Sequence, residues 1–239
     1  DLTLTNSTVS GNSASSGGGI SNGGDLTLTN STVSGNISTR GSFSSGGGIS
    51  NNGGDLTLTD STVSDNFASY RGGGISNGGD LTLTNSTVSD NSASRSGGGI
   101  SNGGDLTLTN SRILGNFSNS SGGGLDAKGT ETLINSTVSG NTASRSGGGI
   151  RIDSSSDDFY LINSLVSSNY AEASGGGLSI SGSNRNIANS TISNNIAVQE
   201  GGGIKNSGSV SLSNSTVFGN AASNDAGGFY NEGTANLAN

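Results

Sequence analysis

The residues best suited to chemistry lie in one stretch, RIDSSSDDFY, which begins at Arg151. It contains Asp153, Asp157 and Asp158, and Lys205 follows further along the chain. Carboxylates beside basic groups on one exposed face could cleave a polysaccharide, because one carboxyl donates a proton while another serves as base or nucleophile. The alternative, which we favour, is an insertion at a corner of the fold that carries a solvated charge cluster.

Composition narrows the other kinds of chemistry. The chain has neither histidine nor cysteine, which excludes serine triads, Cys-His pairs and metal sites built from imidazole or thiolate. A net charge of −8 with nine Lys and Arg in 239 residues argues against a nucleic-acid partner. No apolar run is long enough to span a membrane, so no membrane insertion is expected. We predict no enzymatic activity, no cofactor and no resident metal.

These residues are positioned by a repeat of about 25 residues. With 44 glycines and only 28% apolar residues, the composition is typical of disorder, yet the few aliphatic residues recur at fixed places. An anchor position holds Asn6, Asn30, Asp60, Asn85, Asn110, Asn135, Asn163, Asn189 and Asn214. Six residues later a second column holds Asn12, Asn36, Asn66, Asn91, Asn116, Asn141, Asn169, Asn195 and Asn220.

Within each repeat the pattern is that of short strands. LTLT alternates apolar and polar residues, so Leu2 and Leu4 share one face. Val9 and Ile20 centre two further strand-like pieces, and no helical periodicity occurs. The sequence predicts an all-β fold, a parallel β-helix of about nine coils with three short strands per coil. Stacked coils place equivalent residues of successive repeats above one another, so both asparagine columns are expected to form amide ladders.

Residues 1–239 are expected to form a single β-helix segment. Neither end shows a polar cap in the sequence, and the last residues return to the strand and anchor pattern, with Leu237 and Asn239 matching Leu4 and Asn6. We therefore expect a part of a longer chain, or a subunit that associates end to end.

A column of aspartates opens the first five repeats, at Asp1, Asp25, Asp55, Asp80 and Asp105. Like charges at one strand spacing repel unless they are screened or bridged. Calcium between the coils is one interpretation. The favoured one is that each aspartate closes the NGGD turn through local backbone hydrogen bonds.

Threonines form a two-column T-x-T array, at Thr3/Thr5, Thr27/Thr29, Thr57/Thr59, Thr82/Thr84 and Thr107/Thr109. Such arrays occur in ice-binding solenoids, but threonine is also an ordinary residue on exposed strands. The array breaks at Thr132/Ile134, Tyr160/Ile162, Asn186/Ala188 and Ser211/Ser213.

The variable loops before the GGG triplets contain Arg40, Arg71, Arg95 and Arg145. Loops that protrude from a rigid scaffold are where recognition concentrates. These arginines would form a sparse basic line on an acidic rod, or they are isolated solvated side chains that keep the surface soluble.

The pairing of VSGN, VSDN, ILGN or VFGN with a following GGGI resembles the repeats of polymorphic outer-membrane and autotransporter-like adhesin passengers. It is more similar still to bacterial right-handed parallel β-helix repeat proteins of cell surfaces. This resemblance implies a pectate-lyase-like right-handed superhelix and an extracellular or cell-surface rod, stalk, adhesin or fibre. It also implies partners such as a cell-surface polysaccharide, or a host or neighbouring cell surface. Two alternatives stay open: a carbohydrate-binding or carbohydrate-cleaving β-helix, and an ice-binding solenoid that uses the T-x-T face.

Overall fold

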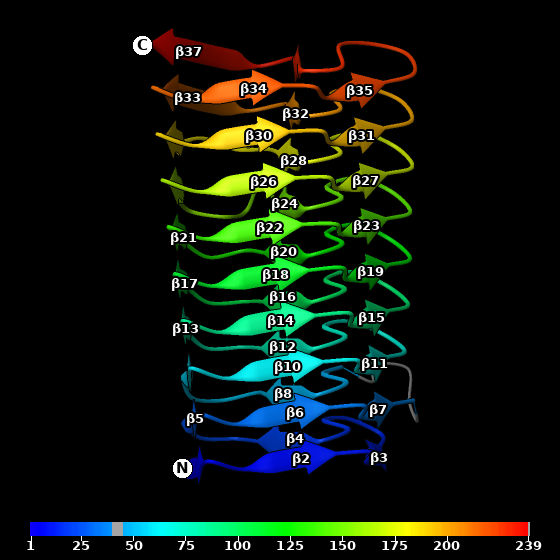
Figure 1. The fold of residues 1–239 in the computed structure, drawn as a ribbon, viewed down its shortest axis with the longest axis vertical. Helices are drawn as coiled ribbons and strands as arrows, with labels where there is room; N and C mark the ends of the chain where they lie inside the picture. The colour runs from blue at the N-terminus through cyan, green and yellow to red at the C-terminus, as the bar shows by residue number, and fades with distance from the viewer. Residues whose placement is uncertain (40–44, 239) are drawn as a thin grey trace.

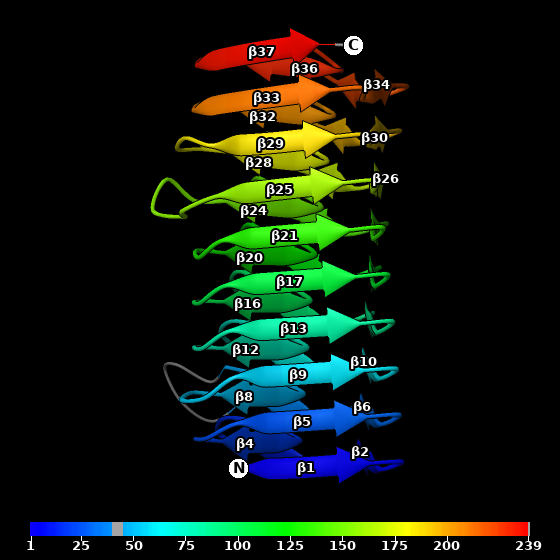
Figure 2. The same cartoon turned by 90° about the vertical axis from the view of Figure 1, so that its left-hand side faces the viewer.

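The computed structural model describes residues 1–39 and 45–238, and every regular element in them is a β-strand. The strands lie in four parallel sheets that run the length of a solenoid of about nine coils. The chain climbs from the bottom to the top of Figure 1 while the front strands β2, β6 and β10 run from left to right. In Figure 2 the strands β1, β5 and β9 point toward that front face, so the coil is right-handed, as expected.

Four strands make up each coil. Sheet A consists of β1 (Leu2–Thr5), β5 (Leu26–Thr29), β9 (Leu56–Thr59), β13 (Leu81–Thr84), β17 (Leu106–Thr109), β21 (Glu131–Ile134), β25 (Phe159–Ile162), β29 (Arg185–Ala188), β33 (Ser209–Ser213) and β37 (Thr234–Ala238). Sheet B consists of β2 (Thr8–Ser10), β6 (Thr32–Ser34), β10 (Thr62–Ser64), β14 (Thr87–Ser89), β18 (Arg112–Leu114), β22 (Thr137–Ser139), β26 (Leu165–Ser167), β30 (Thr191–Ser193) and β34 (Thr216–Phe218).

The other two sheets hold shorter strands. Sheet C consists of β3 (Ser13–Ala14), β7 (Ile37–Ser38), β11 (Phe67–Ala68), β15 (Ser92–Ala93), β19 (Phe117–Ser118), β23 (Thr142–Ala143), β27 (Tyr170–Ala171), β31 (Ile196–Ala197) and β35 (Ala221–Ala222). Sheet D consists of β4 (Ile20–Asn22), β8 (Ile49–Asn51), β12 (Ile75–Asn77), β16 (Ile100–Asn102), β20 (Leu125–Ala127), β24 (Ile150–Ile152), β28 (Leu178–Ile180), β32 (Ile204–Asn206) and β36 (Phe229–Asn231).

Sheets A, B and D correspond to the three strands predicted from LTLT, from STVSGN and from GGGIS. Sheet C is an additional finding. Its strands have two residues each, which is too short for an alternation of apolar and polar residues to show in the sequence.

The register stacks equivalent residues directly. Leu2 pairs with Leu26 and Leu4 with Leu28, and Val63 pairs with Val88. Strand alternation turns one column inward and the next outward. Leu28, Leu58 and Leu83 are fully buried as a result, and the lumen is filled by aliphatic columns from sheets A, B and D.

Corners between the sheets use residues that accept a left-handed backbone. The anchor Asn6 has a φ of 50° and Asn85 a φ of 51°, a conformation that asparagine tolerates better than most residues. In the GGG triplets the chains of successive coils touch, because a Cβ at Gly47 would run into the carbonyl oxygen of Gly73. The described residues include no helix long and apolar enough to cross a membrane.

Candidate functional site

The second asparagine column forms an unbroken ladder, as predicted, and it is buried from Asn36 to Asn195. In a typical step the side-chain Nδ2 of Asn66 donates to Oδ1 of Asn91 over 2.9 Å and to the carbonyl of Val33 over 3.0 Å. Oδ1 of Asn91 also accepts the backbone N–H of Asn66 over 3.0 Å. Equivalent side-chain bonds link Asn12, Asn36, Asn66, Asn91, Asn116, Asn141, Asn169, Asn195 and Asn220. Each amide inside the ladder is thereby satisfied away from water.

The anchor column is exposed and only partly joined. Among the described residues its side chains are linked from Asn30 to Asn6 over 2.6 Å, from Asn85 to Asp60 over 3.2 Å and from Asn110 to Asn85 over 3.4 Å. Asn135 lies exposed at the equivalent corner. The main role of this column is the left-handed corner, and the ladder bonds add to it.

Two further ladders were missed by the sequence analysis. At the ends of the sheet D strands, the side-chain Nδ2 of Asn22 donates to Asn51, that of Asn51 to Asn77 and that of Asn77 to Asn102, over 2.9 to 3.1 Å. In the serine column, the backbone N–H of Ser61 donates to Oγ of Ser86 over 3.1 Å. The recurring ISN and NST triplets were the available signals.

The charged insertion is organised around Arg151. Its guanidinium donates to Asp126 over 2.8 Å and to Asp153 over 2.6 Å. Partial burial alone would raise the pKa of Asp153, but the N–H of Ser155 and the Arg151 guanidinium hold it below its ordinary value. The structure therefore joins Arg151 and Asp153, and it adds Asp126, a buried carboxylate that the sequence analysis did not single out.

The remaining predicted members of this cluster lie apart. Asp157 is exposed, and Asp158 accepts a hydrogen bond from the Tyr160 hydroxyl over 3.1 Å. Lys205 lies in the same outward column as Arg151 but two coils away, with Ser179 between them. A separate cluster forms there.

That second cluster surrounds the Lys205 ammonium. Its Nζ pairs with Glu200 over 2.8 Å and with Glu232 over 2.9 Å, and it lies 4.1 Å from the centre of the Tyr230 ring. Burial opposes the charge on Lys205, but the hydrogen bonds that its ammonium donates to Glu200 and Glu232 outweigh this effect and raise its pKa.

Two ionisable side chains in the lumen were also missed. Glu131 occupies a position of the inward leucine column, between Leu106 and Phe159 in register. Arg185 occupies the same column two coils later. Arg185 donates to the carbonyls of Ser181, Asp153, Ser156 and Asp157, which holds the insertion against the core. The departures from LTLT in ETLI and RNIA were the signal in the sequence.

Glu131 is fully buried and neither of its carboxyl oxygens has a hydrogen-bond partner. Burial raises its pKa to about 8, while the positive charge of Arg185 lowers it in part. The Gly129 N–H lies close and also lowers it slightly, without completing a bond of normal geometry. The side chain is therefore an uncharged acid at neutral pH.

The aspartate column is stabilised by backbone donors of the neighbouring coil rather than by its own turn. The N–H of Asp55 donates to Asp25 over 3.0 Å, and that of Asp105 to Asp80 over 3.0 Å. In residues 1–39 and 45–238, no three acidic side chains gather as a metal site would require. Calcium bridging stays an alternative prediction, and the backbone donors offset part of the like-charge repulsion without it.

The threonine array is in register on the outer face of sheet A. Thr27 stacks on Thr57, and Thr82 on Thr107. The breaks fall where they were expected, since Thr132 stacks on Tyr160 and Tyr160 on Asn186.

Of the predicted loop arginines, Arg40 lies outside the described residues. The guanidinium carbons of Arg71 and Arg95 lie 5.1 Å and 4.9 Å from the centre of the Tyr70 ring. Arg145 faces Arg95 across a shallow surface hollow of about 340 Å³. The loop arginines are thus partly organised, by stacking and by this hollow.

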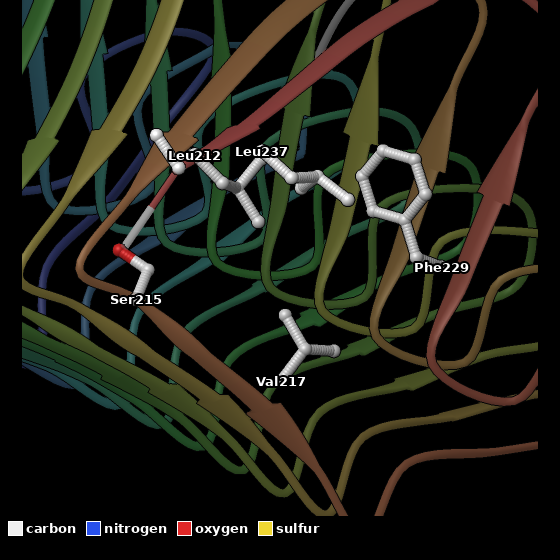
Figure 3. A pocket seen from close by; sticks show the side chains of 6 residues that line it. Leu212, Ser215, Val217, Phe229 and Leu237 are labelled. Atoms are coloured by element: carbon white, nitrogen blue, oxygen red, sulfur yellow. The ribbon is translucent and has the colours of Figure 1, made fainter.

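A hollow of about 320 Å³ at the last described coils is of another kind. Leu212, Val217, Phe229 and Leu237 line it in Figure 3. Leu212 and Leu237 belong to the inward column of sheet A, so this hollow continues the lumen and is not a separate site.

Comparisons of the chain with protein-family models, with curated proteins and with solved structures found no match. The structure itself shows a parallel β-solenoid. The resemblance to autotransporter-like adhesins stays a prediction.

Proposed function

We propose that this chain is a structural and adhesive β-solenoid, a rod, stalk or fibre component at an extracellular or cell-surface location, without enzymatic activity. The observation that carries the proposal is the continuous asparagine ladder from Asn12 to Asn220, which ties each of these coils to the next. A side-chain ladder and four backbone sheets along one axis resist bending, and stiffness over length is what a rod supplies.

The charged groups support a structural role over catalysis. A general acid and a base must be free to exchange protons with a substrate. Asp126 and Asp153 are both engaged by Arg151, and Glu200 and Glu232 by Lys205. These carboxylates serve to connect neighbouring segments of the coil.

The partners we propose are those of a surface rod. Adjoining coils of a parent chain or end-to-end copies would extend it, and a cell-surface polysaccharide or a neighbouring or host cell surface would be bound by it. Neither nucleic acid nor a membrane interior is proposed as a partner, since the chain carries a net charge of −8.

The test is to locate and image the native protein. Antibodies against the purified chain should label intact cells, and brief protease treatment of those cells should remove the label. Electron cryo-microscopy should show stiff rods with an axial repeat near 4.8 Å, the usual spacing of neighbouring strands. Labelling only after the cells are opened would contradict the proposal.

A second candidate function is ice binding, favoured by one observation. The paired threonines stack in register from Thr27/Thr29 to Thr107/Thr109 on a single sheet. Inhibition of ice recrystallisation tests it, with Thr82→Tyr as the disrupting variant because Tyr160 occupies the same column. Thr87→Arg on sheet B is the control, since Arg112 occupies that column. Equal activity of all three proteins, or none in the unmodified chain, rejects this candidate.

A further inference from the structure

The outward column of sheet C alternates between aromatic and small residues from Phe67 to Tyr170, and an isoleucine flanks this stretch on each side. In register it reads Ile37, Phe67, Ser92, Phe117, Thr142, Tyr170 and Ile196. Phe117 is 39% exposed, and Phe67 and Tyr170 are half-buried. Each ring therefore lies two coils from the next ring, which is about 9.5 Å or twice the usual strand spacing. A small residue separates each ring from the next.

A second column follows three residues later in each coil and alternates in the opposite phase. The N–H of Arg95 donates to the carbonyl of Tyr70, and the N–H of Arg145 to that of Ser120. Ser120 lies in the coil between those of Arg95 and Arg145, so the two arginines are also two coils apart. Arg95 belongs to the coil of Ser92, and Arg145 to the coil of Thr142. Each arginine thus lies in a coil that lacks a ring.

These arginines have no carboxylate partner among the described residues, whose ion pairs involve Arg151 and Lys205. Arg95 and Arg145 are exposed, and Ser94, Asn119 and Ser120 floor the hollow between them. The neighbouring Arg71 has a buried Nε without a hydrogen-bond partner. Guanidinium groups without a carboxylate partner, on a chain of net charge −8, favour an anionic ligand. Glu172, exposed in the next coil, limits this basic segment on one side.

We propose that this surface, formed by Phe67, Arg95, Phe117, Arg145 and Tyr170, binds an acidic polysaccharide with one anionic group per disaccharide. A span of two coils is close to the length of one disaccharide unit in an extended chain. The C–H faces of alternate sugars pack on the rings, and the anionic groups pair with the two arginines, which recognise carboxylate and sulfate groups with two parallel hydrogen bonds. This inference rests on the proposed adhesive function and names its ligand.

The experiment is a calorimetric titration of the purified chain with hyaluronan oligosaccharides, in which every second sugar carries a carboxylate group. Dextran supplies a neutral polysaccharide, polygalacturonate a charge on every sugar, and polyglutamate an acidic polymer without sugars. We expect hyaluronan to bind most tightly and its affinity to fall with added salt. Equal or tighter binding of any of the other three polymers, or no binding of hyaluronan, would overturn the proposal.

The variants use residues that the fold already accepts in each column. Arg145→Ser copies Ser120, and Phe117→Ser copies Ser92. Arg112→Thr is the matched charge control, because Arg112 stacks between Thr87 and Thr137 on sheet B. We expect Phe117→Ser to weaken binding about three- to tenfold and Arg145→Ser about two- to fivefold. Arg112→Thr should leave it unchanged. Equal effects of Arg145→Ser and Arg112→Thr, with no effect of Phe117→Ser, would show non-specific charge attraction and reject the site.

The outcome separates this inference from the proposed function. Surface labelling of intact cells without hyaluronan binding would reject the proposed ligand and would leave the proposed surface rod standing. Hyaluronan binding that depends on Phe117 and Arg145, without surface labelling, would reject the proposed cell-surface location and would support the proposed binding site.

Discussion

Glu131 and Arg185 lie in the lumen on either side of Phe159, in one register column and two coils apart. Both replace residues of an otherwise aliphatic column, and both are buried. Arg185 finds four backbone carbonyls of the chain around the insertion, whereas Glu131 finds no hydrogen-bond partner. The column therefore holds one ion that is satisfied and one acid that is kept neutral.

The neutral acid makes stability depend on pH. The pKa of Glu131 is about 8 in the folded chain against an ordinary 4.5, so the folded state holds a proton that the unfolded state releases above 4.5. The contribution of the protonated Glu131 to the free energy of unfolding is fully present below pH 4.5 and is lost as the pH rises through 8. The loss reaches roughly 5 kcal/mol, at 1.36 kcal/mol per pKa unit.

Urea unfolding at pH 5 and at pH 8.5 measures this loss, with Glu131→Gln as the comparison. The difference in unfolding free energy between the two pH values should be several kcal/mol larger in the unmodified chain. An identical difference in both proteins would contradict the assignment. Glu131→Leu, which copies Leu106, should be more stable than the unmodified chain at pH 8.5.

The asparagine ladder should fail at any single step. Asn91→Ala removes the acceptor of both the backbone and the side-chain N–H of Asn66, and it leaves the carbonyl of Val63 without its amide donor. Buried groups without partners cost about 1 to 3 kcal/mol each, so we expect a loss of about 3 kcal/mol or more. Chemical denaturation measures it. Asn110→Asp, which copies Asp60 in the exposed anchor column, should change stability by less than about 0.5 kcal/mol.

Arg185 should control the order of the insertion. Arg185→Leu frees the carbonyls of Asp153, Ser156 and Asp157. We expect hydrogen exchange to become faster between residues 153 and 158. The amides of Asn66 and Asn91 should keep their protection. Unchanged exchange in the insertion would show that Arg151 alone holds it in place.

Lys205 should hold the last coils together in a manner that depends on salt and pH. It bridges Glu200 to Glu232, whose side chains are 29% and 49% exposed, so we expect Lys205→Gln to cost no more than about 1 kcal/mol. Because its pKa is raised in the folded chain, this contribution is complete below the ordinary value of 10.5 and is lost as the pH rises beyond it. Thermal unfolding in low and high salt, at pH 7 and pH 11, checks both effects.

The sequence predicted the features that repetition controls. Asn91 could be placed in a ladder because its column has no exception, and Leu83 in the lumen because LTLT alternates. The two-residue strand Phe67–Ala68 could not be predicted, since no periodicity shows in two residues. The stacking of Arg71 and Arg95 on Tyr70 depends on a loop conformation that their types and spacing do not specify. Glu131 and Arg185 were missed for a different reason, because a charged residue at an inward position contradicts the expectation that charges face water.

The direct register of the coils has a consequence for how the gene can change. Residues 80–104 form one complete repeat, and its removal would join Gly79 to Asp105 with Asn66 facing Asn116 and Leu56 facing Leu106. Each asparagine donor of the buried ladder would still meet an asparagine acceptor, and each buried leucine a leucine. Loss or duplication of one such repeat by recombination would therefore alter the reach of the molecule by a fixed step while leaving the buried leucine and asparagine columns in register.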